Sequence, residues 1–279
     1  MSTSPKAFVT GNPVKHSKSP LLHGYWLKKY NISGTYTAIE TDENNLPELI
    51  EQVRNGEMRG GNVTIPHKQL AFNLCDRHTE TAKKIGAVNT VWAENGKICG
   101  DNTDGYGFLA NLDHQLPQWD RHKGCAIILG AGGAARAILS ALVDKGFKTI
   151  YLLNRTLARA EQLAQEFDGP IIPQTLDKFN ELAADADFVV NTSSIGMHGS
   201  KFEQLDVHKL PETAIVTDIV YTPLMTPLLQ DAKDRGLNIA TGLGMLLHQA
   251  VPGFEIWFGQ KPEVDQALMD YMLAEIENG

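Results

Sequence analysis

The hydrophobic residues of this chain of 279 residues follow two different periods that alternate along the sequence. Short apolar runs such as Cys125–Leu129 are typical of buried strands, whereas apolar residues three or four positions apart, as in Ala134–Lys145, are typical of helices. This alternation predicts an α/β protein with mostly parallel sheets. The predicted strands are Lys6–Thr10, Gly60–Val63, Val88–Trp92, Lys97–Cys99, Cys125–Leu129, Thr149–Leu153, Phe188–Asn191, Ile215–Asp218 and Asn238–Ala240, and the predicted helices are Ser19–Lys29, Leu46–Arg54, 104–114, Ala134–Lys145, Leu157–Glu166, Pro227–Arg235, Met245–Phe258 and Val264–Glu277.

The pattern changes at Asp104, which predicts two domains. A regular series of strands and helices runs from Cys125 to Ala240, and two amphipathic helices follow it. We therefore expect a first α/β domain over residues 1–104 plus 244–279 and a doubly wound, Rossmann-type domain over residues 105–243. In this arrangement the C-terminal helices return to the first domain.

Composition narrows the functional class. A formal net charge of -8 argues against non-specific nucleic-acid binding, which needs a basic surface. The segment Met1–Lys6 lacks the apolar core of a signal peptide, and no stretch approaches the roughly 20 apolar residues of a membrane span. The three cysteines have no Cys-x-x-Cys spacing, and the nine histidines show no metal-ligand spacing. We therefore expect a cytoplasmic protein with reduced cysteines, no membrane contact and no metal.

A glycine-rich turn follows the strand Cys125–Leu129. Gly130-x-Gly132-x-x-Ala135 is one form of the dinucleotide-binding fingerprint, in which a helix N-terminus faces the pyrophosphate. Gly133 and Ala134 would open that helix. The alternative is a purely structural turn in a doubly wound sheet, but the strand before the turn and the helix after it favour a dinucleotide site.

The end of the next strand indicates which dinucleotide. NAD sites usually place an acid there to bind the ribose hydroxyls, but this chain has Asn154, Arg155 and Thr156, with Arg159 one turn later. Two guanidinium groups and a hydroxyl suit a 2′-phosphate, which predicts NADP(H). A solvent-exposed arginine pair is the alternative.

Lys68 and Asp104 are the candidates for proton transfer. Lys68 follows a predicted strand, a Thr and a Pro, and Asp104 stands where the two predicted domains join. A lysine beside an aspartate can exchange a proton with an alcohol and stabilise a developing alkoxide. A solvent-exposed lysine and an N-cap aspartate explain the same residues, and the sequence alone leaves both interpretations open.

Other polar residues are candidates for binding a hydroxylated, acidic ligand. Ser17 and Ser19 stand in a loop entering a helix, where two hydroxyls can bind a carboxylate, although helix capping by Ser19 explains one of them. Asn89 and Thr90 end the small-residue run Gly86-Ala87-Val88, and Gln249 lies in a predicted helix. Each of these is equally compatible with an ordinary hydrogen-bonded polar group.

Together these segments closely resemble the shikimate dehydrogenase family, and the matching runs occur in order from residue 11 to about 250. They are Gly11-Asn12-Pro13, Ser17-Lys18-Ser19-Pro20, Asn62-Val63-Thr64-Ile65-Pro66 with Lys68, Gly86-Ala87-Val88-Asn89-Thr90, Gly100-Asp101-Asn102-Thr103-Asp104-Gly105, Gly130 to Arg136, Asn154-Arg155-Thr156 and Gly242-Leu243-Gly244-Met245-Leu246.

The resemblance implies NADP-dependent, reversible reduction of 3-dehydroshikimate to shikimate, in the pathway to chorismate and the aromatic amino acids. It makes the first domain the substrate-binding domain and the second the NADP-binding domain. It also implies roles for residues at the matching positions. These are Lys68 and Asp104 as the catalytic pair; Ser17 and Ser19, with Tyr221 nearby, for the substrate carboxylate; Thr64, Asn89 and Gln249 for the substrate hydroxyls and reacting oxygen; Gly130, Gly132, Gly133 and Ala134 for the pyrophosphate; Asn154, Arg155, Thr156 and Arg159 for the 2′-phosphate; and Ile219 and Gly242 beside the nicotinamide.

Two residues depart from the family's pattern. They are His67, where many relatives carry an aromatic or another residue, and Thr241, where an acid is common. Three other functions stay open: a quinate/shikimate dehydrogenase using NAD, a relative acting on an amino-substituted analogue, and a non-catalytic NADP-binding sensor. The arginine pair argues against the first and the intact Lys68 and Asp104 against the last. A monomer and a homodimer are both compatible with the sequence.

Overall fold

The computed structural model describes residues 4–277, which form two compact units. The first unit comprises the residues up to Asp104 together with those from Leu246 onward, and the second is Gly105–Met245. Helices α5 (Asp104–Gln115) and α10 (Leu243–Phe258) contain the points at which the chain passes from one unit to the other. The first predicted domain also included residues 1–3 and 278–279, which lie outside the described residues.

The first unit is built on a mixed sheet of six strands. Its order is β2-β1-β3-β5-β6-β4, with β1 parallel to both β2 and β3. Strand β5 is antiparallel to β3 and forms the predicted hairpin with β6. The strands are β1 (Lys6–Gly11), β2 (Thr35–Glu40), β3 (Gly60–Val63), β4 (Arg77–His78), β5 (Thr90–Glu94) and β6 (Lys97–Asp101).

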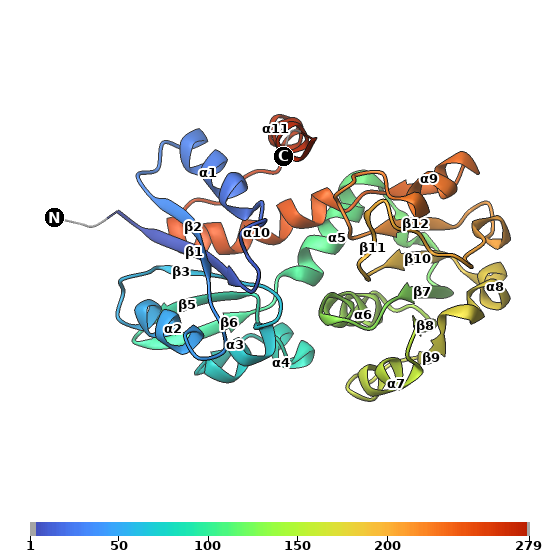
Figure 1. Ribbon diagram of the computed structural model, residues 1–279, viewed down its shortest axis with the longest axis horizontal. Helices are drawn as coiled ribbons and strands as arrows, with labels where there is room; N and C mark the ends of the chain where they lie inside the picture. The colour runs from blue at the N-terminus through green and yellow to red at the C-terminus, as the bar shows by residue number, and fades with distance from the viewer. Residues whose placement is uncertain (1–3, 278–279) are drawn as a thin grey trace. The chain divides into compact units, whose positions relative to one another are not determined.

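Helices cover both faces of this sheet (Figure 1). Helices α2 (Leu46–Arg54) and α3 (Lys68–Leu74) pack on the face that carries Phe8, in a core that includes Ile50 and Ala71. Helix α1 (Ser19–Lys29) and the second half of α10 cover the other face, where aromatic side chains of both helices meet Tyr36 of β2. Because successive strand residues point to opposite faces, each strand contributes to both cores.

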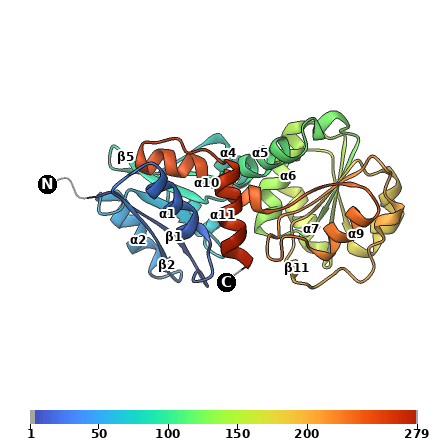
Figure 2. The same ribbon diagram turned by 90° about the horizontal axis from the view of Figure 1, so that it is seen from above.

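The C-terminal helix α11 (Gln266–Glu277) returns to the first unit and lies beside α1 (Figure 2). The indole of Trp26 donates a hydrogen bond to the carbonyl of Glu263 at 3.1 Å, and Lys29 forms an ion pair with Asp265 at 2.6 Å. The predicted return of the C-terminal helices is therefore confirmed.

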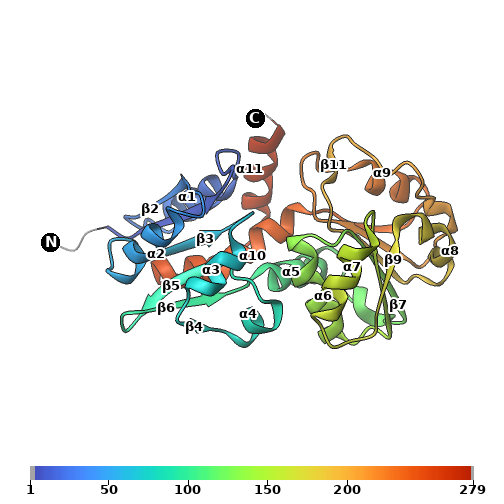
Figure 3. The same ribbon diagram turned by 60° about the horizontal axis from the view of Figure 1, so that its bottom comes forward.

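The second unit is a doubly wound sheet of six parallel strands in the order β13-β12-β10-β7-β8-β9. Helices α5, α6 and α7 share one core with one face of the sheet, and α8 and α9 share another with the opposite face (Figure 3). The predicted Rossmann-type organisation is confirmed. The elements are β7 (Cys125–Leu129), α6 (Gly133–Lys145), β8 (Thr149–Asn154), α7 (Leu157–Gln165), β9 (Ile171–Thr175), α8 (Phe179–Leu182), β10 (Phe188–Asn191), β11 (Ile195–His198), β12 (Ile215–Asp218), α9 (Pro227–Asp234) and β13 (Asn238–Ala240).

The sequence did not predict several elements. Strands β2 and β9 lie at the edges of their sheets, where only one neighbour strand supports them. Pro173 within β9 has no N–H to donate and occurs in strands mainly at such edges. Helix α11 begins at Gln266 rather than Val264, since the Asp265 carboxylate accepts the Leu268 N–H at 3.0 Å. The other elements without a prediction are α4 (Glu80–Ile85), β4, α8 and β11.

Candidate active site

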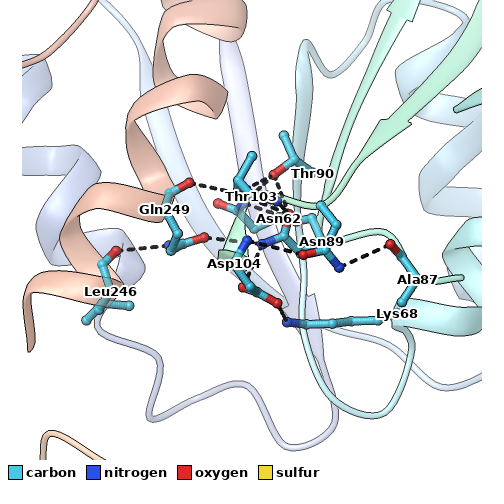
Figure 4. Close-up of polar contacts among 10 residues, drawn as sticks. Asn62, Lys68, Ala87, Asn89, Thr90, Thr103, Asp104, Leu246 and Gln249 are labelled. Atoms are coloured by element: carbon cyan, nitrogen blue, oxygen red, sulfur yellow. Dashed lines mark hydrogen bonds and ion pairs between the residues drawn. The ribbon is translucent and has the colours of Figure 1, made fainter. Parts of the chain in front are cut away.

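Lys68 and Asp104 form an ion pair inside the first unit (Figure 4). Lys68 is the first residue of α3, which follows β3 after a short loop, and Asp104 opens α5 directly after β6. The two side chains are only 17% and 10% exposed, so Lys68 is not the solvent-facing lysine of the alternative interpretation. A lysine and an aspartate paired in a nearly dry setting are equipped to hold and move a proton.

The second carboxylate oxygen of Asp104 is held by Asn89. The Asn89 Nδ2 donates to Asp104 Oδ1 at 2.8 Å, while its Oδ1 accepts the backbone N–H of Thr103 at 2.9 Å. Because a backbone N–H can only donate, this contact fixes which end of the Asn89 amide faces Asp104. The carboxylate of Asp104 is thus bound by side chains on both oxygens, which does not fit the role of a simple helix N-cap.

Gln249 of α10 lies at the edge of this cluster (Figure 4). Its Oε1 is 3.5 Å from Asn89 Nδ2, and its Nε2 donates to the Leu246 carbonyl at 3.0 Å. The structure therefore brings four of the predicted site residues together within one unit. Asn62, Thr90 and Thr103 join them through buried hydrogen bonds. The sequence made Thr90 a candidate for binding a hydroxyl, but it gave Asn62 and Thr103 no role.

Ser17, Ser19 and Thr64 follow the carboxyl ends of β1 and β3, which are parallel neighbours, so both loops leave the same edge of the sheet. Ser19 is the first residue of α1 and Lys18 stands at the N-cap, so Ser19 does not cap the helix; Ser17 Oγ accepts the Ser19 N–H at 3.3 Å. The Thr64 hydroxyl is half-buried and has no hydrogen-bond partner within residues 4–277. Ser17 and Thr64 are half-buried, so a ligand could reach their hydroxyls, whereas Ser19 is only 6% exposed.

His67 precedes Lys68 but plays a structural part. Its side chain is 2% exposed, and its Nε2 is hydrogen-bonded to the Thr41 carbonyl at 2.7 Å. In the second unit, Thr241 contacts α5 in a similar way, since its backbone N–H donates to Gln115 Oε1 at 3.0 Å. His67 and Thr241, the two residues that depart from the family's pattern, therefore both have hydrogen-bond partners nearby.

A pocket in the second unit lies beside the glycine turn. Gly130 has φ +105°, a conformation that favours glycine, and the Asn154 Oδ1 accepts the Ala131 N–H at 3.3 Å. Arg155 and Arg159 border the pocket, are exposed, and have no carboxylate partner in the described chain. The lining residues are Gly130, Asn154, Arg155, Thr156, Arg159, Leu176, Ser193, Ser194, Ile195 and Phe202.

The open space around this turn fits a dinucleotide. A Cβ added to Gly132 or Gly133 would meet no other heavy atom within 4 Å, so the N-terminus of α6 is accessible. An accessible helix N-terminus beside two unpaired guanidinium groups suits a ligand with phosphates at two positions. Ser193, Ser194 and Ile195 were not predicted; they follow β10, the neighbour of β7, and their place at the same sheet edge could have indicated them.

The remaining predicted cofactor residues lie at the end of β12. Asp218 accepts hydrogen bonds from Asn191 Nδ2 at 2.8 Å and from the Val220 N–H at 2.9 Å, which shapes the segment that holds Ile219 and Tyr221. Burial raises the pKa of Asp218 above its usual range, and its hydrogen bonds offset part of this effect. A side chain at Gly242 would meet the Ile219 carbonyl at 2.6 Å, so only glycine fits there.

The described residues contain no cluster of three or more His, Cys, Asp or Glu able to hold a metal ion. All three cysteines are buried and unpaired. No helix within residues 4–277 has the length and apolar character needed to span a membrane.

Comparisons with known proteins decide the family. Three family models match: the shikimate dehydrogenase substrate binding domain over residues 9–91, shikimate/quinate 5-dehydrogenase over 113–224, and the shikimate 5′-dehydrogenase C-terminal domain over 242–268. A shikimate dehydrogenase (NADP+) of Sinorhizobium fredii is 50% identical over 273 residues, covering 97% of this chain and 95% of the relative. The chain belongs to the shikimate dehydrogenase family.

Further related proteins match over nearly the whole chain, at lower sequence identity. A shikimate dehydrogenase (NADP+) of Brucella abortus is 47% identical over 279 residues, covering 99% of this chain and 96% of the relative. The structure of the Thermus thermophilus shikimate 5-dehydrogenase, in complex with NADP(H) and shikimate, has a TM-score of 0.85 at 37% identity and covers 98% of this chain and 99% of its own. The structure of a quinate dehydrogenase of Corynebacterium glutamicum in complex with NAD has a TM-score of 0.89 at 28% identity. The match covers 97% of this chain and 99% of the quinate dehydrogenase chain.

Proposed function

We propose that this protein is an NADP-dependent shikimate dehydrogenase, which reversibly reduces 3-dehydroshikimate to shikimate in the pathway to chorismate and the aromatic amino acids. The observation that carries the proposal is the buried Lys68–Asp104 pair, with Asn89 on the second carboxylate oxygen. The curated relatives that share about half of its residues over nearly the whole chain bear this activity in their names.

The two units take different parts in the proposal. The first binds the substrate, with Ser17 and Ser19 as partners for the carboxylate, and Tyr221 is a further candidate for that role. Thr64, Asn89 and Gln249 bind the ring hydroxyls and the reacting oxygen. The unpartnered hydroxyl of Thr64 and the loops at one sheet edge support this assignment.

The second unit binds NADP(H), which supplies or takes up the hydride when bound. The N-terminus of α6, with Gly130, Gly132, Gly133 and Ala134, would hold the pyrophosphate. Asn154, Arg155, Thr156 and Arg159 would hold the 2′-phosphate, and Ile219 and Gly242 would border the nicotinamide.

Lys68 moves the proton in this mechanism. As the carbonyl carbon of 3-dehydroshikimate gains hydride, negative charge develops on its oxygen, and the Lys68 ammonium stabilises that charge and donates a proton to it. In the reverse direction the neutral amine of Lys68 takes the proton from the shikimate hydroxyl. Asp104 orients Lys68 through the ion pair between them.

The arginine pair separates this proposal from the quinate dehydrogenase that uses NAD. Arg155 and Arg159 have no carboxylate to neutralise them within the described residues, so an added phosphate would supply the missing charge. The proposal also includes a cytoplasmic location and a monomeric or homodimeric state, and light scattering after size-exclusion chromatography distinguishes the two states.

Product analysis tests the proposed reaction. The purified protein, incubated with 3-dehydroshikimate and NADPH, is expected to form shikimate in equal amounts to the NADPH consumed, as measured by chromatography. Oxidation of NADPH without shikimate formation would contradict the assigned reaction. Tight NADPH binding without any turnover would instead favour a non-catalytic NADP-binding sensor.

A further inference from the structure

Tyr36 of β2 starts a buried chain of hydrogen bonds that ends at the catalytic carboxylate. Its phenol is buried at 7% exposure, and Tyr36 Oη donates to Asn62 Oδ1 at 2.6 Å. Asn62 Nδ2 in turn donates to the Asn89 carbonyl at 3.1 Å and to Thr90 Oγ1 at 3.3 Å. Tyr36 also contacts Ser19, and it reaches the Lys68–Asp104 pair only through other residues.

The remaining steps run in one direction (Figure 4). The Thr90 hydroxyl donates to Asn89 Oδ1 at 2.8 Å, and Asn89 Nδ2 donates to Asp104 Oδ1 at 2.8 Å. An amide nitrogen can only donate and a hydroxyl has a single proton, so each donor fixes the role of the next group. All members are at most 7% exposed, and hydrogen bonds in such a chain strengthen one another.

The surroundings of Tyr36 keep its hydroxyl in the donor role. The ring of His23 stacks on the Tyr36 ring with centroids 3.8 Å apart and planes 8° from parallel. Neither nitrogen of His23 has a hydrogen-bond partner in the described chain, so the imidazole contacts Tyr36 by its face alone. Burial raises the pKa of Tyr36 well above its usual value, more than contacts with Ser19 and Asn62 offset. The phenol therefore stays protonated.

We propose that Tyr36, Asn62 and Thr90 are positioning residues for the proposed dehydrogenase reaction, which orient Asn89 and, through it, the Asp104 carboxylate that pairs with Lys68. The inference rests on the proposed function, because it assigns a purpose to the Asp104–Lys68 pair. Tyr36 anchors the chain because its hydroxyl is the donor to Asn62 Oδ1, while the Asn89 carbonyl, which can only accept, holds the other end of the Asn62 amide.

Tyr36→Phe removes this donor and nothing else of the ring. The buried Asn62 Oδ1 then lacks a partner, and a shift of the Asn62 side chain in response would loosen its bond to Thr90 and, through Thr90, the contact that holds Asn89. We expect kcat to fall roughly three- to tenfold, with the pH profile of kcat displaced by about half a unit. The Kd for NADP+ should stay within about twofold, because the glycine turn belongs to the second unit.

A matched set of variants separates positioning from folding. Thr90→Val breaks the same chain at equal volume and should lower kcat like Tyr36→Phe, whereas Thr90→Ser keeps the hydroxyl and should recover at least about half of the wild-type kcat. Because both breaks act on one chain, the double variant Tyr36→Phe/Thr90→Val should be no slower than the slower single variant. Tyr30→Phe is the control, since the Tyr30 hydroxyl accepts the Glu263 N–H at 3.0 Å, outside the chain.

Two results together would overturn the inference, whatever the variants do to Tm. Tyr36→Phe and Thr90→Val would keep kcat within twofold of the value for Tyr30→Phe, and the pH profile of kcat would not be displaced. A crystal structure of Tyr36→Phe supplies a second readout, which does not need turnover. It should show the Asn62 side chain displaced from Thr90 and the contact between Asn89 and Asp104 lengthened, and unchanged geometry would contradict the inference. Failure of the proposed function is distinguishable, because the wild type and Tyr30→Phe would then be inactive as well.

Discussion

Replacing His23 with phenylalanine should remove part of the acid sensitivity of the first unit. The His23 side chain is fully buried among Trp26, Tyr36, Phe254 and Trp257, and neither ring nitrogen has a partner in the described chain. Burial lowers its pKa from 6.5 to about 3, and Asn62 offsets only part of this effect. The folded protein therefore holds a neutral imidazole where the unfolded chain takes up a proton.

The sign and size of the change in unfolding free energy with pH follow from this difference in proton binding. Below pH 6.5 the unfolded chain binds the extra proton, so the free energy of unfolding falls as the pH falls from 6.5 towards 3. Between pH 7.5 and pH 5 the loss from this residue is roughly 2 kcal/mol, taking about 1.4 kcal/mol for each of 1.5 pH units. The loss disappears in His23→Phe, because phenylalanine binds no proton in either state. Any cost of packing the larger ring is the same at both pH values and cancels.

Urea denaturation measures this difference. Tryptophan fluorescence suits it, because Trp26 and Trp257 lie against His23 and report on the first unit. Between pH 7.5 and pH 5 the wild type should lose roughly 2 kcal/mol more unfolding free energy than His23→Phe. Equal losses in the two proteins, or an NMR titration of His23 near pH 6.5 in the folded state, would refute the reasoning.

Three further predictions concern the proposed site. Lys68→Ala should lower kcat about 100-fold or more, with little change in the Kd for NADP+, and a loss below about threefold, worth less than roughly 1 kcal/mol, would show that Lys68 carries no proton. Arg155→Ala or Arg159→Ala should weaken NADP+ binding about tenfold or more, measured by calorimetry, while NAD+ binding changes little; equal effects on both would place the 2′-phosphate elsewhere. Gly132→Ala should leave Tm nearly unchanged because its Cβ meets no other atom within 4 Å, yet weaken NADP+ binding by crowding the pyrophosphate, and unaltered binding would argue against a phosphate at this turn.

The sequence predicted the second unit more completely than the first. Strands such as β7 are buried at every position, so their apolar runs stand out from the helical period around them. Strand β2 was missed because only one of its six residues, Tyr36, is fully buried and the others face solvent or lie at intermediate depth. An edge strand of this kind has no apolar run to detect.

In the candidate site, too, some residues could be identified from the sequence and others only from the structure. Lys68 and Asp104 could be singled out because a charged pair has a chemical meaning that residue types carry by themselves. The contacts of Asn62 and Thr90 depend on the pairing of β3 with β5, which sets Asn62 opposite Thr90. A shift of one residue in that register would turn the side chains to the other face of the sheet, and no local pattern determines it. The chain from Tyr36 to Asp104 therefore required the structure.

The most direct test of the central claim is a set of initial rates with shikimate and quinate, each with NADP+ and NAD+. The account predicts a strong preference for shikimate with NADP+, because the arginine pair suits the 2′-phosphate and the paired serines and Thr64 suit shikimate. A preference for NAD+ or for quinate would contradict the roles given to Arg155 or to Ser17 and Ser19. Absence of turnover with all four pairs, together with tight NADP+ binding, would contradict the assignment as a dehydrogenase.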